Sequence, residues 1–366
     1  MKYYSLTNIL KKNCRYNVIF GERSNGKTYS VIELALKNYL AGKGQLGVIR
    51  RWREDFRGKR ANNYFNSLVD NGKHENVVKK LSKGKFDRII YYSSCWYLAY
   101  FDTELNKVIQ DEKPFAYAFA LSEMEHEKGN SFSGITTILF DEFITRGLYL
   151  NDEFVLFMNT LSTIIRDRNN VKVFMCANTV SRFCLYFAEM GLKHVKNMKQ
   201  GDIDVYEYAN SELKVAVEYA DSPSRNKPSD VYFAFDNPKL KMITGGEWEL
   251  SIYPHLRYKN DNDDIIFTYF IVFDEHILQA DIYDDEHGTY TYIHMKTSDI
   301  KKPEEDIIFS PDAVELSNCY TNIAKPVNKL TKKIYWYFVA DKVFYQTNDI
   351  GDIVNSYITN CKHMIR

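Results

Sequence analysis

The segment that most constrains the fold is a glycine-containing loop between a strand pattern and a helix pattern. Residues 21 to 28 read GERSNGKT, which fits the spacing GxxxxGKT, and they follow the apolar run YNVIF. A stretch with helical spacing of apolar residues begins after Thr28. In a strand–loop–helix unit of this kind, backbone N–H groups converge on phosphate oxygens at a helix N-terminus. The sequence therefore predicts a phosphate-binding loop built around Gly21 and Gly26.

The loop also predicts which ligands are bound. Lys27 is expected to reach the β and γ phosphates of a nucleoside triphosphate, and the Thr28 hydroxyl is expected to bind Mg²⁺. Arg23 adds another cation close to the nucleotide. ATP and Mg²⁺ are thus the expected ligands. The alternative, an accidental glycine-rich turn, does not account for the strand and the helix on either side.

A second motif, which is acidic, bears on ATP hydrolysis. The run ITTILFDEF (135 to 143) is an apolar strand that ends in Asp141 and Glu142. The aspartate is expected to hold Mg²⁺ through its hydration shell, and the glutamate to orient and polarise the attacking water. A catalytic glutamate directly after the Mg²⁺ aspartate marks ATPases of the additional-strand group, whereas nucleotide kinases and small GTPases generally lack it. The alternative is a polar strand end without function.

Short apolar runs alternate with helical patterns through the first half of the chain. Continuous apolar strands between helices favour a mainly parallel sheet covered on both faces. In the additional-strand topology, the strand at residues 171 to 178 lies between the phosphate-loop strand and the Asp-Glu strand. The side chain of Asn178 is then expected to point at the γ-phosphate and to sense hydrolysis. A helix or turn cap is the alternative for this asparagine.

Two arginines precede that strand, Arg166 and Arg168. In a ring of identical subunits, arginines at such a position often reach a neighbour's γ-phosphate and stabilise charge in the transition state. The alternative is a solvated helix end, where cations interact favourably with the helix dipole. Sequence alone leaves both interpretations open.

A cluster of cations lies in a chain that is otherwise neutral. The chain has 48 Lys and Arg against 48 Asp and Glu, so any contact with nucleic acid must be local. The segment IRRWREDFRGKR follows the second strand on the same edge as the nucleotide, and it could follow a phosphate backbone or reach an adjacent subunit's nucleotide. A charged surface is the alternative. The candidate residues are Arg50, Arg51, Arg53, Arg57, Lys59 and Arg60.

Length and composition indicate two domains and an intracellular chain. With 366 residues, we expect an ATPase domain at residues 1–200, a linker at 201–230 and a β-rich domain at 231–366. No apolar run approaches the roughly 20 residues that span a bilayer, and the N-terminus lacks the features of a secretory signal. The six dispersed cysteines are typical of reduced thiols in a cytosolic protein.

The C-terminal half is rich in aromatic and β-branched residues between turn signals, which indicates an antiparallel sheet. A two-metal nuclease needs several converging carboxylates. Most candidates here fall in apparent turns, which favours a solvated surface over a metal site, and His276 and His287 lack a spacing that indicates zinc. The carboxylates in question are Asp236, Asp274, Glu275, Asp281, Asp284 and Asp285.

Together, GERSNGKT, IRRWREDF, SFSGITTILFDEF, IIRDRNNVKVFMCANT and the β-rich C-terminal part resemble the DNA encapsidation ATPases of small protein-primed tailed phages, which are related to terminase large subunits. The resemblance covers the first 200 or so residues well and the remainder only in layout. It implies a homopentameric ring, in the host cytoplasm and transiently on the portal vertex of a procapsid, that hydrolyses ATP and moves double-stranded DNA inward.

The resemblance also implies roles for single residues. Lys27 and Thr28 would bind phosphate and Mg²⁺, Asp141 would bind Mg²⁺, and Glu142 would activate water. Arg168 is the first choice for an arginine finger acting in trans, with Arg166 second.

The β-rich domain is expected to resemble a ribonuclease-H-like nuclease that has lost its catalytic carboxylates. Some relatives also need a structural RNA. Two other functions remain open: a terminase with an active C-terminal nuclease, and a nucleotide-binding regulatory or scaffold ATPase.

Overall fold

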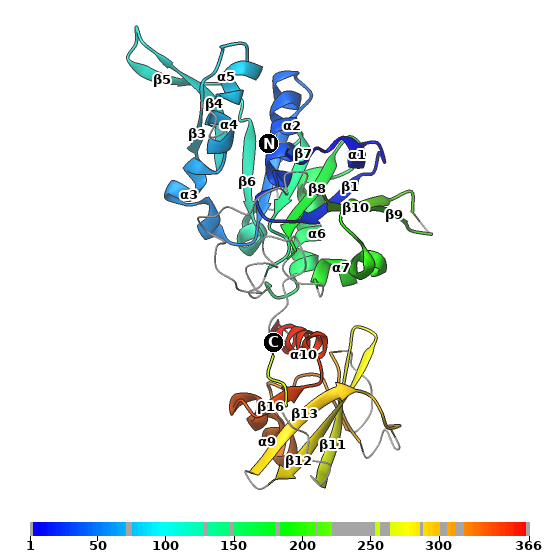
Figure 1. Ribbon diagram of the computed structural model, residues 1–366. Coiled ribbons are helices and arrows are strands. Elements are labelled where there is room, and N and C mark those ends of the chain that lie inside the picture. Colours follow the sequence, from blue (N-terminus) through cyan, green and yellow to red (C-terminus); the bar gives the residue numbers. More distant parts are fainter. Residues whose placement is uncertain are drawn as a thin grey trace, which may run out of the picture. The chain divides into compact units, whose positions relative to one another are not determined.

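The structure is a computed structural model, and the residues it describes form two compact units, Met1–Trp248 and Glu249–Arg366 (Figure 1). The described residues are 3–70, 75–127, 131–145, 149–179, 184–209, 211–221, 253–256, 264–285, 288–300, 306–311 and 318–363. Among them, no helix combines the length and the apolar character that crossing a membrane requires.

The first unit alternates strands and helices, as the apolar runs predict. In chain order its elements are α1 (Thr7–Leu10), β1 (Tyr16–Gly21), α2 (Lys27–Leu40), β2 (Gln45–Arg50), η1 (Arg53–Phe56), α3 (Gly58–Asn63), α4 (Asn66–Val69), α5 (Val77–Leu81), β3 (Arg88–Tyr92), β4 (Cys95–Asp102), β5 (Lys107–Gln110), β6 (Ala116–Ala120), η2 (Leu121–Glu127), β7 (Ile135–Asp141), α6 (Glu153–Ile165), β8 (Lys172–Asn178), α7 (Leu185–Glu189), η3 (Lys193–Asn197), β9 (Ile203–Glu207) and β10 (Lys214–Ala220).

These strands form one sheet in the order β3-β4-β6-β2-β7-β8-β1-β10-β9, with β5 paired to β4. The central strands β6, β2, β7, β8, β1 and β10 are parallel to one another, so their carboxyl ends meet at one edge. Strand β8 lies between β7 and β1, which confirms the predicted additional strand. Antiparallel pairs occur at both flanks, where β3, β4, β5 and β9 join. The fold is therefore mixed α/β with a largely parallel sheet.

Both faces of this sheet are covered, because the buried residues of the central strands alternate between two cores. In β7, Phe140 packs in the core with α6 and α7, whereas Leu139 packs in the core with α1, α2 and α5. The same alternation places Phe20 of β1 in the first core and Ile19 in the second. Near-continuous burial along each strand explains the uninterrupted apolar runs in the sequence.

The sheet extends further along the chain than the sequence predicts. Strand β10 pairs in parallel with β1, and β9 pairs antiparallel with β10, although both fall within residues 201–230, which we assigned to a linker. Val215 and Val217 of β10 are fully buried in the sheet core. Residues 222–252 lie outside the described residues, so the linker there and the domain boundary remain predictions.

The second unit contains β11 (Asp264–Phe273), β12 (His276–Asp285), β13 (Gly288–Met295), β14 (Ile307–Phe309), β15 (Cys319–Tyr320), α9 (Lys329–Val339), β16 (Val343–Tyr345) and α10 (Asn348–His363). Its sheet has the order β15-β14-β11-β12-β13-β16. The predicted antiparallel pairing is found in β11, β12 and β13. Strands β14, β15 and β16 join in parallel, which the sequence does not predict, because each arrives after a longer connection rather than a tight turn.

Candidate nucleotide site

The phosphate loop connects β1 to α2 at the carboxyl edge of the first sheet. Ser24 and Gly26 both have positive φ angles, 61° and 95°, so the backbone turns back on itself just before the helix. Gly21 approaches β10 so closely that a Cβ atom there would lie 2.9 Å from the carbonyl oxygen of Ala220. Two of the predicted glycines are thus required by a left-handed turn and by a close approach. Arg23 is exposed at the loop surface.

Lys27 lies beneath this loop and is only 5% exposed. Its Nζ atom donates to the carbonyl oxygens of Gly21 and Glu22 at 3.2 and 2.7 Å, and to the Oδ1 atoms of Asn25 and Asn178 at 3.3 and 3.1 Å. Burial lowers the pKa of Lys27 to about 8, against the raising influence of nearby acidic groups. The lysine thus contacts Asn178 at the end of β8, while the predicted role of Asn178 as a sensor of hydrolysis stays a prediction.

Asp141, the last residue of β7, collects three side-chain donors. Its Oδ1 atom accepts from the Thr28 hydroxyl at 2.8 Å, and its Oδ2 atom accepts from the Tyr64 hydroxyl at 3.0 Å and from Arg50 Nη1 at 3.3 Å. Burial raises the pKa of Tyr64 well above its ordinary value, as does the carboxylate itself, so the phenol stays protonated and donates. The two predicted Mg²⁺ residues, Thr28 and Asp141, are in direct contact.

Glu142 follows Asp141 and differs from it in solvent exposure and in backbone conformation. Its side chain is 60% exposed, and its φ angle of 60° lies in the left-handed region that non-glycine residues seldom adopt. Arg50 Nη2 forms an ion pair with its Oε2 atom. Burial alone would lower the pKa of Arg50, but Asp141, Tyr64 and Glu142 together raise it. One guanidinium, from the end of β2, thus holds both acidic residues of the motif.

The residues at this edge fit a nucleotide with Mg²⁺. A hydroxyl next to a carboxylate is a hard oxygen donor set of the kind that Mg²⁺ prefers. Asn25 Oδ1 accepts from the backbone N–H of Lys27 at 3.2 Å, and its Nδ2 atom is buried with no hydrogen-bond partner among the described residues. An unsatisfied donor inside the loop is what an anion such as phosphate would satisfy.

The basic segment divides into two parts, and the side chains of one part are turned into the unit rather than toward solvent. Arg51 is 6% exposed, and Glu153, at the start of α6, is 0% exposed. The guanidinium donates to both Glu153 carboxylate oxygens, from Nε at 2.6 Å and from Nη2 at 2.8 Å, and to the backbone oxygen of Phe143 at 3.0 Å. The Tyr186 hydroxyl completes the group by donating to Glu153 at 2.7 Å. Arg50 and Arg51 are therefore removed from the nucleic-acid candidates, because both guanidiniums are used inside the unit.

The remaining cations of the segment are exposed. Arg53 pairs with Glu123 at 2.5 Å, and Arg57 lies 3.8 Å from Glu54. Lys59 and Arg60 project from α3 into solvent. These four side chains keep the predicted role in nucleic-acid contact as a hypothesis.

The two arginines before β8 lie away from the phosphate loop of their own chain. Arg168 donates to five backbone carbonyl oxygens at the amino-terminal end of β7 and the end of α6, whereas Asp141 is at the other end of β7. Burial lowers the pKa of Arg168. Arg166 ends α6 with a φ angle of 50° and is exposed. Neither residue can serve the nucleotide of its own chain from this position, so a role in trans stays a prediction. The acceptors of Arg168 are the carbonyl oxygens of Phe132, Ser133, Ile135, Ile164 and Ile165.

Among the described residues of the second unit, the predicted carboxylates do not gather. Asp274 and Glu275 form the tight turn between β11 and β12, both with positive φ, and Asp284 is exposed. Asp281, by contrast, is buried. Within the described residues, no group of three or more potential ligands is placed to hold a metal. Asp236, His287 and the side chain of Asp285 lie outside the described part of the chain.

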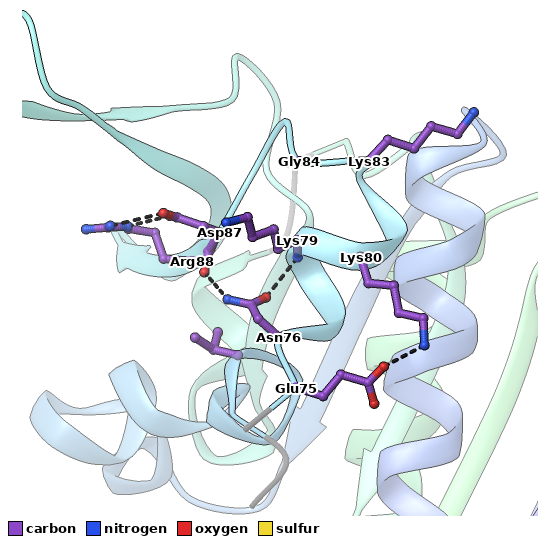
Figure 2. A pocket seen from close by; sticks show the side chains of 9 residues that line it. Glu75, Asn76, Lys79, Lys80, Lys83, Gly84, Asp87 and Arg88 are labelled. Atoms are coloured by element: carbon purple, nitrogen blue, oxygen red, sulfur yellow. Dashed lines mark hydrogen bonds and ion pairs between the residues drawn. The ribbon is translucent and has the colours of Figure 1, made fainter. Parts of the chain in front are cut away.

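A cavity of about 980 Å³ lies elsewhere, between α5 and the start of β3 (Figure 2). Its charged residues largely pair with one another: Lys80 with Glu75 at 2.5 Å, and Arg88 with Asp87 at 2.7 Å (Figure 2). The Asn76 side chain caps α5 by accepting from the backbone of Lys79. None of the predicted site residues lines this cavity, so we assign it no chemistry.

Sequence reasoning missed three contributors to the site: the clamp role of Arg50, the Tyr64 hydroxyl and the buried Glu153. An arginine at a strand end beside the phosphate edge was a usable signal for the first. Glu153 follows the ordinary pattern of an acid in the first turn of a helix, and Tyr64 lies in a stretch without any motif. Neither carries a sequence signal of its role.

The family described as podovirus DNA encapsidation protein (Gp16) matches residues 100–242. The DNA packaging protein of Bacillus phage B103 is 25% identical over 215 residues, which is 58% of this chain and 58% of that protein. The DNA packaging protein of Bacillus phage phi29 is 25% identical over 222 residues, 60% of this chain and 58% of the relative. The chain resembles the podovirus DNA encapsidation proteins. The matched region spans somewhat more than half of these relatives' length.

Solved structures agree with this resemblance at the level of fold. The Phi-28 gp11 DNA packaging motor has a TM-score of 0.54 and 17% identity, and the match covers 98% of both chains. The bacteriophage Phi-29 viral genome packaging motor assembly has a TM-score of 0.55 and 17% identity, covering 96% of this chain and 97% of that one. Both units of the chain thus share their fold with packaging-motor proteins.

Proposed function

We propose that this chain is a DNA-packaging ATPase that couples ATP hydrolysis to the movement of double-stranded DNA into a procapsid. One observation carries the proposal: the Thr28 hydroxyl from the phosphate loop donates to Asp141 at 2.8 Å, which joins the two ATPase motifs in one site. Hydrolysis is supported by Glu142 beside that aspartate, and DNA as the cargo by the packaging proteins that the chain resembles.

Each residue of the site has a task in this proposal. Lys27 would exchange its carbonyl and amide acceptors for the phosphate oxygens of ATP. Thr28 and Asp141 would hold Mg²⁺, which when bound neutralises the charge that develops on the phosphate oxygens. Asn178 contacts Lys27 directly, so a change at the phosphates would reach β8 through that bond.

Glu142 is the proposed general base, and in this arrangement it is not free to act. Its Oε2 atom is engaged by Arg50 Nη2, so this oxygen is not available to accept a hydrogen bond from the attacking water. Hydrolysis therefore requires Glu142 to leave Arg50. The Glu142 side chain is 60% exposed, so there is room for such a rotation. The arrangement described here is then a resting one.

The larger assembly follows from the resemblance. We infer a homopentameric ring on a procapsid portal in the host cytoplasm, with Arg168, or else Arg166, acting as a finger on a neighbour's nucleotide, and with a structural RNA as a further possible partner. Arg53, Arg57, Lys59 and Arg60 would contact the DNA backbone. The second unit would derive from a ribonuclease-H-like nuclease without its metal carboxylates, a proposal supported by its central antiparallel strands with parallel strands at the flanks.

The test is a packaging assay with the purified full-length chain. Protein, matching procapsids, double-stranded DNA and ATP are mixed, and DNA that has become resistant to added nuclease is measured. We expect protected DNA with the wild-type chain and none with Lys27→Ala. ATP hydrolysis that does not respond to procapsids and DNA, without protected DNA, would indicate the regulatory or scaffold ATPase instead. Metal-dependent cutting of the DNA by the chain itself would indicate a terminase.

A further inference from the structure

The aspartate of the site is contacted by a part of the chain outside the phosphate loop and the acidic motif. Tyr64 directly follows α3, within the segment that connects β2 to β6. Its hydroxyl donates to Asp141 Oδ2 at 3.0 Å, while Thr28 donates to Oδ1. The two oxygens of the carboxylate therefore have separate partners, one from the phosphate loop and one from the α3 region.

The hydroxyl is held in place by the packing of its ring. The Tyr64 ring lies 4.9 Å from that of Phe65 and 5.6 Å from that of Trp96, measured between ring centroids. Trp96 is fully buried in β4, and its Nε1 atom donates to the carbonyl oxygen of Ala61 in α3 at 2.8 Å. Helix α3, Tyr64 and β4 are thus tied into one packed group. If α3 shifts, the Tyr64 hydroxyl must therefore move with it.

The outer surface of the same helix is basic and exposed. Arg57 precedes α3 as its N-terminal cap residue, and Lys59 and Arg60 lie in its first turn. All three are exposed, within seven residues of Tyr64 in the sequence. Cations in such a cluster bind a phosphate backbone by displacing its counterions. A polyanion bound here would act on the element that carries Tyr64.

We propose that Tyr64 is a positioning residue that holds Asp141 in its Mg²⁺-binding orientation and links that orientation to duplex DNA bound on α3. Without the phenol, Oδ1 keeps Thr28 and Oδ2 keeps Arg50, but the hydrogen bond that ties the carboxylate to the α3 region is lost. With the phenol in place, the orientation of the Asp141 carboxylate follows the position of α3. The proposal rests on the proposed function, since it takes Asp141 to be the Mg²⁺ aspartate and duplex DNA to be the polyanion.

The first experiment measures how much Mg²⁺ adds to nucleotide affinity. A non-hydrolysable ATP analogue is titrated into the full chain by calorimetry, once with Mg²⁺ and once with EDTA. Tyr64→Phe keeps the ring and removes only the hydroxyl, so we expect the affinity in EDTA to stay within about twofold of wild type. The gain from Mg²⁺ should fall by about 10- to 100-fold, the usual effect of losing a group that orients a metal ligand.

Tyr91→Phe is the matched control. Its ring packs against the same Trp96 at 4.8 Å, but Tyr91 makes no hydrogen bond to Asp141. This variant should keep the full gain from Mg²⁺. The positioning role is refuted if Tyr64→Phe retains the gain, or if both variants lose it equally. A wild-type chain that binds the analogue neither with Mg²⁺ nor with EDTA would contradict the proposed function instead.

The second experiment adds a short DNA duplex to the same titrations. Duplex bound on α3 should change the Mg²⁺-dependent affinity of the wild-type chain by at least severalfold, and Tyr64→Phe should show the same affinity with and without duplex. An equal shift in both proteins, or no shift in either, would overturn the link through Tyr64. Loss of the wild-type shift in Arg60→Glu would place the duplex on α3, whereas an undiminished shift in that variant would refute this location.

Discussion

Each unit of the chain contains a buried carboxylate that accepts hydrogen bonds from three side chains, and the two carboxylates have different roles. Asp141 is 8% exposed and accepts from a threonine, a tyrosine and an arginine. Asp281 is 2% exposed and accepts from Thr268 at 2.7 Å and from Gln279 at 3.1 Å, with His294 Nε2 at 2.9 Å. Burial and the number of hydrogen bonds do not distinguish these two aspartates.

Their positions in the sheets do distinguish them. Asp141 is the last residue of a parallel strand, where side chains from the start of α2 and the end of β2 converge, and an exposed glutamate follows it. Asp281 lies in the middle of β12, paired with β11 on one side and β13 on the other. A ligand can replace the partners of the first, whereas the partners of the second are fixed by the strand ladders. Ligand sites in α/β sheets lie at strand ends for this reason.

The largest effect should come from the exposed neighbour that only Asp141 has. Glu142→Gln keeps the size of the side chain and removes its basicity. ATP should still bind, while the turnover number should fall by about 10²- to 10⁴-fold, the range that general base catalysis contributes. Single-turnover hydrolysis and nucleotide binding, measured on the same preparation, check this. Wild-type turnover in the variant would remove Glu142 from the mechanism.

The next effect concerns Arg51, the buried cation between the acidic motif and α6. Arg51→Ala should lower the free energy of unfolding by about 3–5 kcal/mol, because it leaves the Glu153 carboxylate buried without its cation. Arg53→Ala, two residues away on the surface, should change it by less than about 0.5 kcal/mol. Chemical denaturation of the first unit, followed by fluorescence, measures both. Equal effects of the two substitutions would show that Arg51 is not the interior residue described here.

A smaller effect should separate the two aspartates themselves. Asp281→Asn should destabilise the second unit by about 1–3 kcal/mol, since its donors lose a charged acceptor in a buried site. Hydrolysis of ATP should stay unchanged. Asp141→Asn should do the opposite, impairing Mg²⁺-dependent hydrolysis with little effect on the second unit. Calorimetric unfolding and an ATPase assay on both variants test the contrast, and reduced hydrolysis in Asp281→Asn with unchanged stability would reverse it.

The smallest effect is a pH dependence of the stability that Asp281 contributes to the second unit. Burial alone would raise the pKa of Asp281, but the bonds from His294, Thr268 and Gln279 outweigh it and lower the pKa below its ordinary value. A carboxyl group with a lowered folded-state pKa contributes stability above its unfolded-state pKa, and this stability is lost as the pH falls through the folded-state value. The stability difference between wild type and Asp281→Asn should therefore shrink below about pH 4. A difference that grows on acidification would contradict this sign.

The sequence predicts those parts of the site that are carried by strand ends and loop spacing. The phosphate loop, the Asp141–Glu142 motif and the strand bearing Asn178 belong to continuous patterns, so periodicity and motif spacing place them correctly. The order β7-β8-β1 is expected from the additional-strand class of ATPases, which the Asp-Glu motif indicates, and it is found in the sheet.

Contacts between segments that are distant in the sequence could not be predicted in this way. Whether Arg51 points to solvent or to Glu153 depends on which face of a strand end meets α6, and an arginine-rich stretch gives the same pattern in both cases. Tyr64 reaches Asp141 only because Trp96, 32 positions later, holds α3 in place. Strands β9 and β10 escaped notice because they extend the sheet beyond the last motif. These features come from tertiary packing, which no local pattern encodes.

Strand β8 also limits how the site can move. The carbonyl oxygen of Cys176 accepts from the N–H of Glu142 at 2.8 Å, and the N–H of Thr179 donates to the carbonyl oxygen of Gly21 at 3.2 Å. The strand ends that carry the acidic motif and the phosphate loop are thus kept two strand spacings, about 10 Å, apart. They cannot approach or separate without breaking a ladder of hydrogen bonds on one side of β8. Opening and closing at this edge are then left to changes of side-chain rotamer, as in Lys27, Arg50 and Glu142, and to elements outside the ladder such as α3.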